Sequence, residues 1–205
     1  MRDLIVNKIM RLVDNGTYNK TALEEMRYGF ECIYILITKG IIVFSFAYIL
    51  GILKYTLFFS LTFGIIRTFA CGLHASKSWI CTISSLLIFI IIPFLCKILV
   101  INKIVRFILM LFMATLIIKY APADTKKRPI INKRKRKIYK VISASLALIY
   151  ISLTFILKNN FILNSLLFSL LLETIMILPT TYKIFKLPYN NYINYLKLHN
   201  LEGRK

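Results

Sequence analysis

The sequence is poor in acidic residues and in cysteine. Only 8 of its 205 residues are Asp or Glu, against 28 Lys and Arg, and it holds 4 Cys and 2 His. The cysteines show no paired spacing of the kind found in secreted domains, which argues against a disulfide framework. No Gly-rich phosphate loop of the Walker type occurs in the sequence, so nucleotide-driven transport is not expected. Five acidic residues interrupt the first 31 positions, so a secretory signal is not expected either.

Hydrophobic residues, in contrast, are abundant and come in long runs. They make up 58% of the chain, and the mean hydropathy is +0.70. A transmembrane helix needs about 20 mostly apolar residues, and six segments approach that length. They cover residues 32–53, 55–66, 79–96, 104–120, 141–157 and 161–181. The predicted fold is an all-α polytopic membrane protein with about six transmembrane helices, of which the second is short enough to be re-entrant.

The net charge of +20 would favour nucleic-acid binding in a soluble chain. Here, however, most basic residues outside the predicted spans fall on one side of the membrane. The outer turns keep only Lys54, Lys97, Lys103 and Lys158, and all other loops and both termini fall on the inner side. This asymmetry matches the positive-inside rule and explains the charge without nucleic acid. It predicts that the termini and the loop around residue 74 lie in the cytoplasm.

A single membrane domain is expected over residues 1–205, with three parts. Residues 1–31 are predicted to form a cytoplasmic or interfacial helical region, because Leu4, Ile5, Ile9 and Leu12 make an apolar stripe with basic neighbours, suited to an anionic leaflet. Residues 32–181 form the transmembrane bundle, and residues 182–205 form a cytoplasmic tail.

The loop between the second and third predicted spans contains the residues with the clearest potential for chemistry. Cys71 and Cys81 bracket it, and His74 lies between them. Cys with His is the minimum for a thiol nucleophile activated by a base. A zinc site is disfavoured, because the segment has no C-x-x-C pair and no fourth ligand. A loop histidine beside a membrane-facing cysteine, without chemistry, remains the alternative.

Helix geometry restricts how the thiol and the imidazole meet. On one straight helix, His74 and Cys81 would be two turns apart, about 10 Å, which is too far for a hydrogen bond. His74 must therefore precede the helix. Ser78 is a suitable N-cap and would place Cys81 in the first turn, where the helix dipole favours the thiolate. Gly72 would let the loop turn back over the helix start.

Two segments carry a family resemblance. The first has the spacing Arg67, four residues, Gly72, one residue, His74, Ala75, five residues, Cys81. The second is Tyr-Ala-Pro-Ala at residues 120–123, ahead of a Lys-Lys-Arg-Pro-Ile turn and a basic stretch. A third similarity is Glu173 ahead of Leu178 and Pro179. In these motifs the chain resembles the accessory gene regulator B (AgrB) membrane endopeptidases of Gram-positive quorum-sensing systems.

The resemblance implies a cysteine endopeptidase without a cofactor or metal. Cys81 would be the nucleophile and His74 its general base, with Arg67 and Gly72 supporting the site. Glu173 and Asp124 would be orienting or structural residues, with Glu173 paired to Lys39 or turned to His74, and Asp124 more in keeping with a turn. The basic loop would bind an acidic substrate tail or lipid through Lys126, Lys127, Arg128, Lys133, Arg134, Lys135, Arg136 and Lys137.

The implied substrate is an AgrD-like precursor peptide with an amphipathic leader, a central segment containing Cys or Ser, and an acidic C-terminal tail. Cleavage ahead of the tail would leave an acyl thioester on Cys81, and cyclisation would give a thiolactone or lactone. Anionic lipids and a second copy of the chain, in a homodimer, are the other implied partners. The alternatives are a small peptide exporter, which leaves the Cys and His loop unexplained, and a membrane scaffold for a sensor kinase, which predicts that Cys81 and His74 can both be replaced without loss.

Overall fold

The computed structural model describes residues 2–13, 19–73, 78–125 and 129–202. Within these ranges the regular secondary structure is helical, and Cys71 and Ala123 form an isolated parallel bridge between two of the connecting segments. This confirms the predicted all-α class. The helices are α1 (Arg2–Val13), α2 (Lys20–Ile49), α3 (Leu53–Ala70), α4 (Ser78–Ile98), α5 (Lys103–Tyr120), α6 (Lys133–Ile156), α7 (Asn160–Ile177), α8 (Pro179–Ile184) and α9 (Asn191–Glu202).

The helices divide into two compact units, Met1–Gly51 and Ile52–Lys205. In the first unit α1 packs against α2, and Val6 is its buried contact residue. Arg27 and Glu31 form an ion pair one turn apart on α2. The interfacial position of α1 and the single membrane domain stay predictions.

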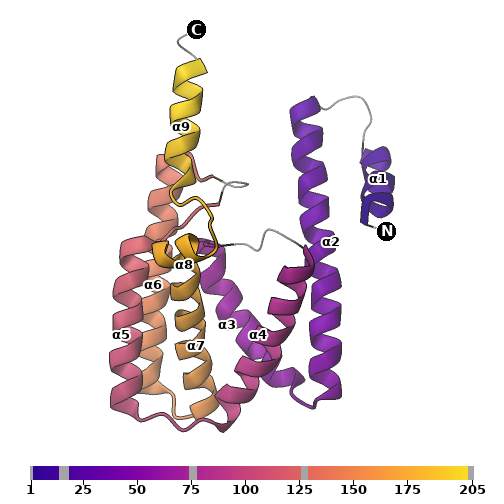
Figure 1. Cartoon of the computed structure of the whole chain (residues 1–205). Helices are drawn as coiled ribbons and strands as arrows, with labels where there is room; N and C mark the ends of the chain where they lie inside the picture. Colours follow the sequence, from indigo (N-terminus) through magenta and orange to yellow (C-terminus); the bar gives the residue numbers. More distant parts are fainter. Residues whose placement is uncertain (1, 14–18, 74–77, 126–128, 203–205) are drawn as a thin grey trace. The chain divides into compact units, whose positions relative to one another are not determined.

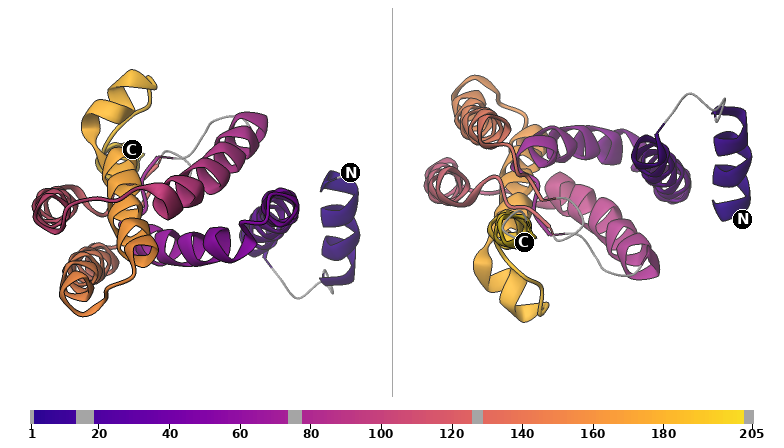
Figure 2. Two further views of the ribbon diagram at one scale, coloured as in Figure 1. Left: turned by 90° about the horizontal axis from the view of Figure 1, so that it is seen from below. Right: turned by 90° about the horizontal axis from the view of Figure 1, so that it is seen from above.

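The second unit is built around α7. This helix contacts α3, α4, α5 and α6, and the end-on views of Figure 2 show it between α3 and α4 on one side and α5 and α6 on the other. Figure 1 shows these five helices running between the same two ends, with α8 and α9 following at one of them. The buried core includes Ile66, Met110, Ile117, Leu170 and Ile177.

The transmembrane count is supported in part. Four helices are long and apolar enough to cross a membrane, in the segments Gly29–Ile49, Ile80–Ile98, Lys133–Ile156 and Asn160–Ile177. A chain with several such helices is a membrane protein. The predicted count of six stays a prediction. So does the re-entrant second segment, although α3 has 18 residues and a length of about 27 Å.

Several helix ends differ from the predicted spans. The helix α2 begins at Lys20 and α6 begins at Lys133, whereas the predicted spans begin at residues 32 and 141. Both helices extend beyond the apolar run, because polar and charged residues can continue a helix. The helix α7 ends at Ile177, ahead of the predicted end at residue 181, because the residue before Pro179 is pushed out of the helical region. The predicted tail contains α8 and α9.

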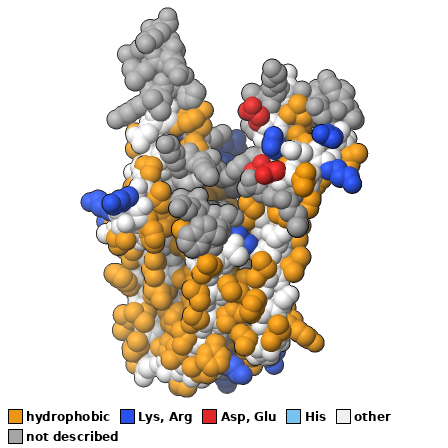
Figure 3. Space-filling model, turned by 45° about the vertical axis from the view of Figure 1, so that its right-hand side comes forward, with side chains coloured by type: hydrophobic (Ala, Val, Ile, Leu, Met, Phe, Trp, Pro, Cys, Tyr) orange, Lys and Arg blue, Asp and Glu red, His pale blue; other side chains and the backbone are white. Residues whose placement is uncertain are grey.

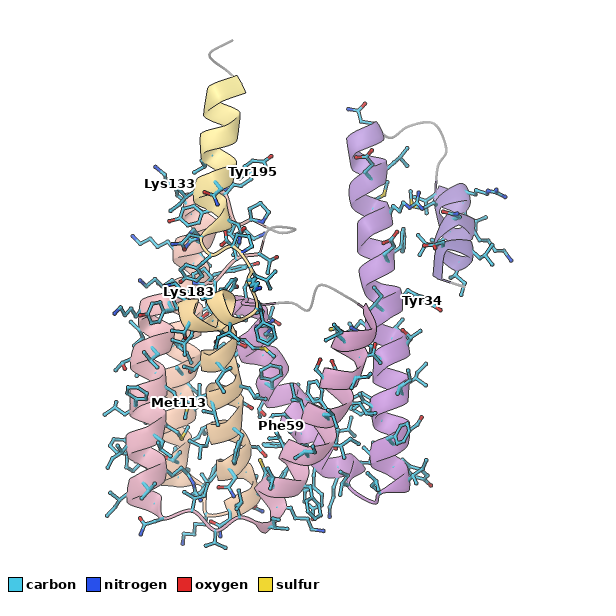
Figure 4. All side chains as sticks on the ribbon, in the orientation of Figure 1. Tyr34, Phe59, Met113, Lys133, Lys183 and Tyr195 are labelled. Carbon is cyan, nitrogen blue, oxygen red and sulfur yellow. The ribbon has the colours of Figure 1, made fainter. Side chains whose placement is uncertain are left out.

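The outer surface of the helices is apolar. Leu61, Phe112, Leu148 and Ile156 are among the exposed hydrophobic side chains, and Figure 3 shows such side chains covering most of the visible face. So much exposed apolar surface is typical of a lipid-facing exterior. Figure 4 places Lys133 and Lys183 toward the end of the second unit where α8 and α9 lie, away from Met113 and Phe59 in the middle of the helices.

The inward face of α7 carries buried polar side chains, which is typical of helix packing in membranes. Ser169 Oγ lies 3.0 Å from Thr62 Oγ1 of α3. Asn164 Nδ2 donates to the carbonyl oxygens of Cys96 (3.1 Å) and Leu99 (2.8 Å), and its Oδ1 accepts from Arg106 Nη2 (3.1 Å). Asn164 therefore joins α4, α5 and α7 at the end of the unit opposite α8.

We expect Asn164→Leu to lower the free energy of unfolding by about 2–4 kcal/mol, because it leaves two carbonyls and a buried guanidinium without their partner. Asn160→Leu is the matched control, since Asn160 is an exposed residue on the same helix. Thermal unfolding of both variants in detergent micelles measures the difference. Equal unfolding temperatures for the two variants would contradict the role of Asn164.

Candidate functional site

The first part of the site is the chain that leaves α3. Arg67 lies in the last turn of α3, and its guanidinium donates to the carbonyl oxygens of Cys71 and Leu73. Arg67 Nη1 also lies 3.5 Å from Glu173 Oε1 of α7, and the Glu173 side chain is fully buried. One guanidinium thus holds two points of the loop and neutralises a carboxylate, a use that suits the fork of donors on Arg.

Gly72 is required by both its conformation and its surroundings. Its φ is +101°, a region that side chains rarely adopt. A Cβ atom at this position would lie 2.6 Å from Arg67 Nη1 and 2.8 Å from the carbonyl oxygen of Met176. Gly72 therefore lets Arg67 and the end of α7 approach the loop backbone.

The second part of the site is the segment after α5, which pairs with the same loop. The Gly72 N–H donates to the carbonyl of Ala123 (2.7 Å), and the Ala123 N–H donates to the carbonyl of Ala70 (3.0 Å). The Leu73 N–H donates to the carbonyl of Met176 at the end of α7 (2.9 Å). The two motif segments and the last residues of α7 thus meet at one end of the unit.

The two predicted catalytic residues follow this anchored loop. His74 lies outside the described residues, but both backbone groups of the preceding Leu73 are held, by Met176 and by Arg67. Cys81 is half-buried in the first turn of α4, and its carbonyl accepts from Ser85 Oγ (2.7 Å). With Ser78 as the predicted N-cap, the helix would start at Trp79, whereas α4 begins at Ser78 itself. The roles of His74 and Cys81 stay predictions.

Glu173 has a different partner from the one predicted. The sequence suggested Lys39, at similar depth in another span, whereas the structure pairs the carboxylate with Arg67. Depth along a helix does not show which neighbouring helix a side chain faces, and the motif gives Arg67 a supporting role at the site without naming Glu173 as its partner. Glu173 as an orienter of His74 stays a prediction.

Asp124 is buried, and it holds the tail. Its carboxylate accepts the N–H groups of Asn191 (3.1 Å) and Tyr192 (2.8 Å), at the start of α9. Arg136 Nη1 lies 3.8 Å from Oδ2 of Asp124, and its guanidinium covers the ring of Tyr192 at 3.7 Å. The sequence shows Asp124 within its motif, but no local pattern points to Asn191 or Tyr192.

The predicted basic loop is helical in its second half. Lys126, Lys127 and Arg128 lie outside the described residues, and the helix α6 begins at Lys133. Asn132 caps this helix, because its side chain accepts from the N–H groups of residues 134 and 135. Lys135 lies over the ring of Tyr139. Among the members that the structure describes, Lys133, Arg134, Lys135 and Lys137 are exposed.

These features define a membrane protein with a charge-anchored loop at one end of its helical bundle. The chain belongs to the accessory gene regulator B family, whose model matches residues 3–177. The match ends with α7, so α8 and α9 lie beyond it.

Relatives in several Gram-positive bacteria are similar over most of their length. A putative AgrB-like protein of Clostridium acetobutylicum is 32% identical over 173 residues, 84% of this chain and 83% of its own. The accessory gene regulator protein B of Staphylococcus aureus strain Newman is 37% identical over 156 residues, covering 76% and 81%. A putative AgrB-like protein of Listeria monocytogenes is 30% identical over 195 residues, covering 95% and 93%. No solved structure matches the chain.

We expect Gly72→Ala to disturb the loop, because the new Cβ would meet Arg67 and Met176 at positive φ. The loss of unfolding free energy should be about 1–3 kcal/mol. Gly64→Ala is the control: nothing lies within 4 Å of a Cβ there, and Ala is the better helix former. Thermal unfolding in micelles compares the two; a Gly72→Ala protein as stable as the Gly64→Ala protein would contradict the close approach.

The pairing of Arg67 with Glu173 is open to a double-mutant cycle. Arg67→Met should destabilise the protein by about 3–5 kcal/mol, since it leaves the buried Glu173 carboxylate without compensation. Glu173→Gln should recover part of that loss in the double variant. Additive effects of the two single substitutions on unfolding would show that the two groups do not interact.

Proposed function

We propose that this protein is a membrane cysteine endopeptidase that processes a quorum-sensing precursor peptide. The observation that carries the proposal is the pairing of the two motif segments through Gly72 and Ala123. Motifs that are about 50 positions apart in the sequence meet around the loop that leads to His74, which is the arrangement expected of a shared functional site. Membership in the accessory gene regulator B family supports the same reading.

The geometry of the described residues suits a thiol nucleophile. Cys81 lies in the first turn of α4, where the unpaired N–H groups of a helix favour negative charge. Leu73 is held on both sides, so the chain enters residue 74 from a fixed point. His74 follows this anchored residue in the sequence, and Cys81 lies at the start of the next helix, so the proposal assigns base and nucleophile to one short segment of the chain.

The proposed reaction begins with proton transfer from the Cys81 thiol to His74. The thiolate attacks the scissile carbonyl, a C–S bond forms, and the C–N bond breaks. His74 returns the proton to the departing amine, so the tail leaves as a free peptide. The central segment remains as an acyl thioester on Cys81.

The second half of the proposed reaction closes the ring. An internal thiol of the precursor attacks the thioester carbonyl and displaces Cys81, whose sulfur regains a proton. One thioester replaces another, so the step needs no nucleotide, but water must be kept from the acyl group. An internal serine hydroxyl in the same place would give a lactone.

The acidic tail of the substrate is proposed to bind exposed basic residues near the start of α6. Lys133, Arg134 and Lys137 are exposed there, and charge attraction would draw an anionic peptide to them. Arg136 is already engaged by Asp124 and Tyr192. The same surface would attract anionic lipids if it faces the cytoplasm. The cytoplasmic side of the site and a homodimer remain part of this proposal.

Reconstitution in liposomes with the precursor peptide tests the proposal by product mass. The intact protein should release the C-terminal tail and give a covalent acyl adduct on Cys81. Cys81→Ala and His74→Ala should each reduce tail release by at least about 10³-fold, because a nucleophile and its base act as one unit.

Matched variants separate the chemistry from general damage. Cys71→Ala keeps the carbonyl that Arg67 binds, and His199→Ala removes the chain's other histidine; both should process the precursor. Tail release that survives both Cys81→Ala and His74→Ala would refute the thiol mechanism. Transport of the peptide without cleavage would favour an exporter.

A further inference from the structure

The tail after α7 packs back onto the motif segment that follows α5. The family match ends at residue 177, yet α8 and the start of α9 bind Asp124 at its side chain and its backbone. Asp124 comes directly after Ala123, the residue that is bridged to Cys71. A continuous set of hydrogen bonds therefore runs from the tail to the loop ahead of residue 74.

Each part of Asp124 is bound by the tail. Its carboxylate takes the N–H groups of Asn191 and Tyr192, as an N-cap residue would. Its carbonyl accepts from Tyr182 Oη (3.1 Å) and Asn191 Nδ2 (3.3 Å). An Asp held at both its side chain and its backbone cannot shift without the tail.

The tail contacts are buried and closely packed. Tyr182 is 1% exposed, and its ring packs edge to face on Tyr189 at 5.1 Å between centroids. Burial raises the pKa of the Tyr182 phenol, so it remains a neutral donor to the Asp124 carbonyl. Asn191 Nδ2 also donates to the carbonyl of Pro188 (2.8 Å), which closes the turn ahead of α9.

We propose that α8 and the start of α9 form a clasp that holds the Ala123 bridge, with Asp124 as the positioning residue at its centre. We define the clasp by Asp124, Tyr182, Tyr189, Asn191 and Tyr192. It fixes Ala123, and Ala123 fixes Gly72 through the parallel bridge. The consequence for peptide processing rests on the proposed function; the consequence for the order of the loop does not.

Hydrogen exchange measured by mass spectrometry tests the clasp without substrate. The N–H groups of Gly72 and Ala123 form the two bridge hydrogen bonds, so peptides containing them report whether the bridge is closed. Asn191→Ala removes both side-chain bonds of Asn191 and should make this exchange roughly tenfold faster. Asp124→Asn should have a larger effect.

The matched control is Asn194→Ala, an exposed asparagine on the same helix. It should leave exchange and processing unchanged. Should Asp124→Asn fail to fold, Asn191→Ala alone carries the test, because it leaves the carboxylate and both backbone donors in place.

Processing by the same reconstituted variants gives the second readout. If the parent protein cleaves the precursor, Asn191→Ala should slow the cleavage roughly tenfold or more, because a small misplacement of the base is costly. Exchange of Gly72 and Ala123 that is unchanged in both clasp variants overturns the proposal, whatever the activity. Faster exchange with full processing overturns the positioning role. A parent protein that cleaves nothing refutes the peptidase, and the exchange result still decides whether the clasp holds the loop.

Discussion

The buried ion pair between Arg67 and Glu173 is the constraint on which the rest of the site depends. A carboxylate inside a bundle of apolar helices is costly unless a cation accompanies it. The guanidinium that neutralises Glu173 also binds the carbonyls of Cys71 and Leu73. Neutralising the carboxylate and fixing the loop are thus one event, and the absence of a side chain at Gly72 makes room for it.

The central helix α7 makes this pair reachable. Small and polar residues on α7, such as Ser165 and Ser169, let neighbouring helices approach closely. Tyr150 of α6 donates to the carbonyl of Thr62 (2.7 Å), next to the contact between Thr62 and Ser169. These polar contacts fix the relative register of α3, α6 and α7. Register in turn sets Glu173 opposite Arg67, one turn before α3 ends.

Hydrophobic runs predicted the helices well, because burial in lipid or core needs apolar length. They did not predict where helices with polar ends begin. The helix α6 starts at Lys133, ahead of the apolar run, since charged residues do not interrupt a helix in water. The motif spacing groups Arg67 with Gly72, and in the structure the Arg67 guanidinium lies against Gly72. The spacing could not show that Glu173 faces Arg67. Nor could it show that Asp124 accepts hydrogen bonds from Asn191 and Tyr192, which follow it by 67 and 68 positions. Contacts between such distant segments leave no local pattern in the sequence.

The loop between α3 and α4 shows how irregular backbone is kept at the end of a membrane bundle. Unpaired peptide groups are not tolerated near hydrocarbon, so a non-helical segment needs partners from the protein. Here the N–H groups of Gly72 and Leu73 bind carbonyls of Ala123 and Met176, and Arg67 binds two of the loop's own carbonyls. The Arg67 side chain of the ion pair therefore stabilises the loop through its backbone carbonyls. The backbone is thus fixed up to Leu73, the residue directly ahead of His74, to which the proposed function assigns the base.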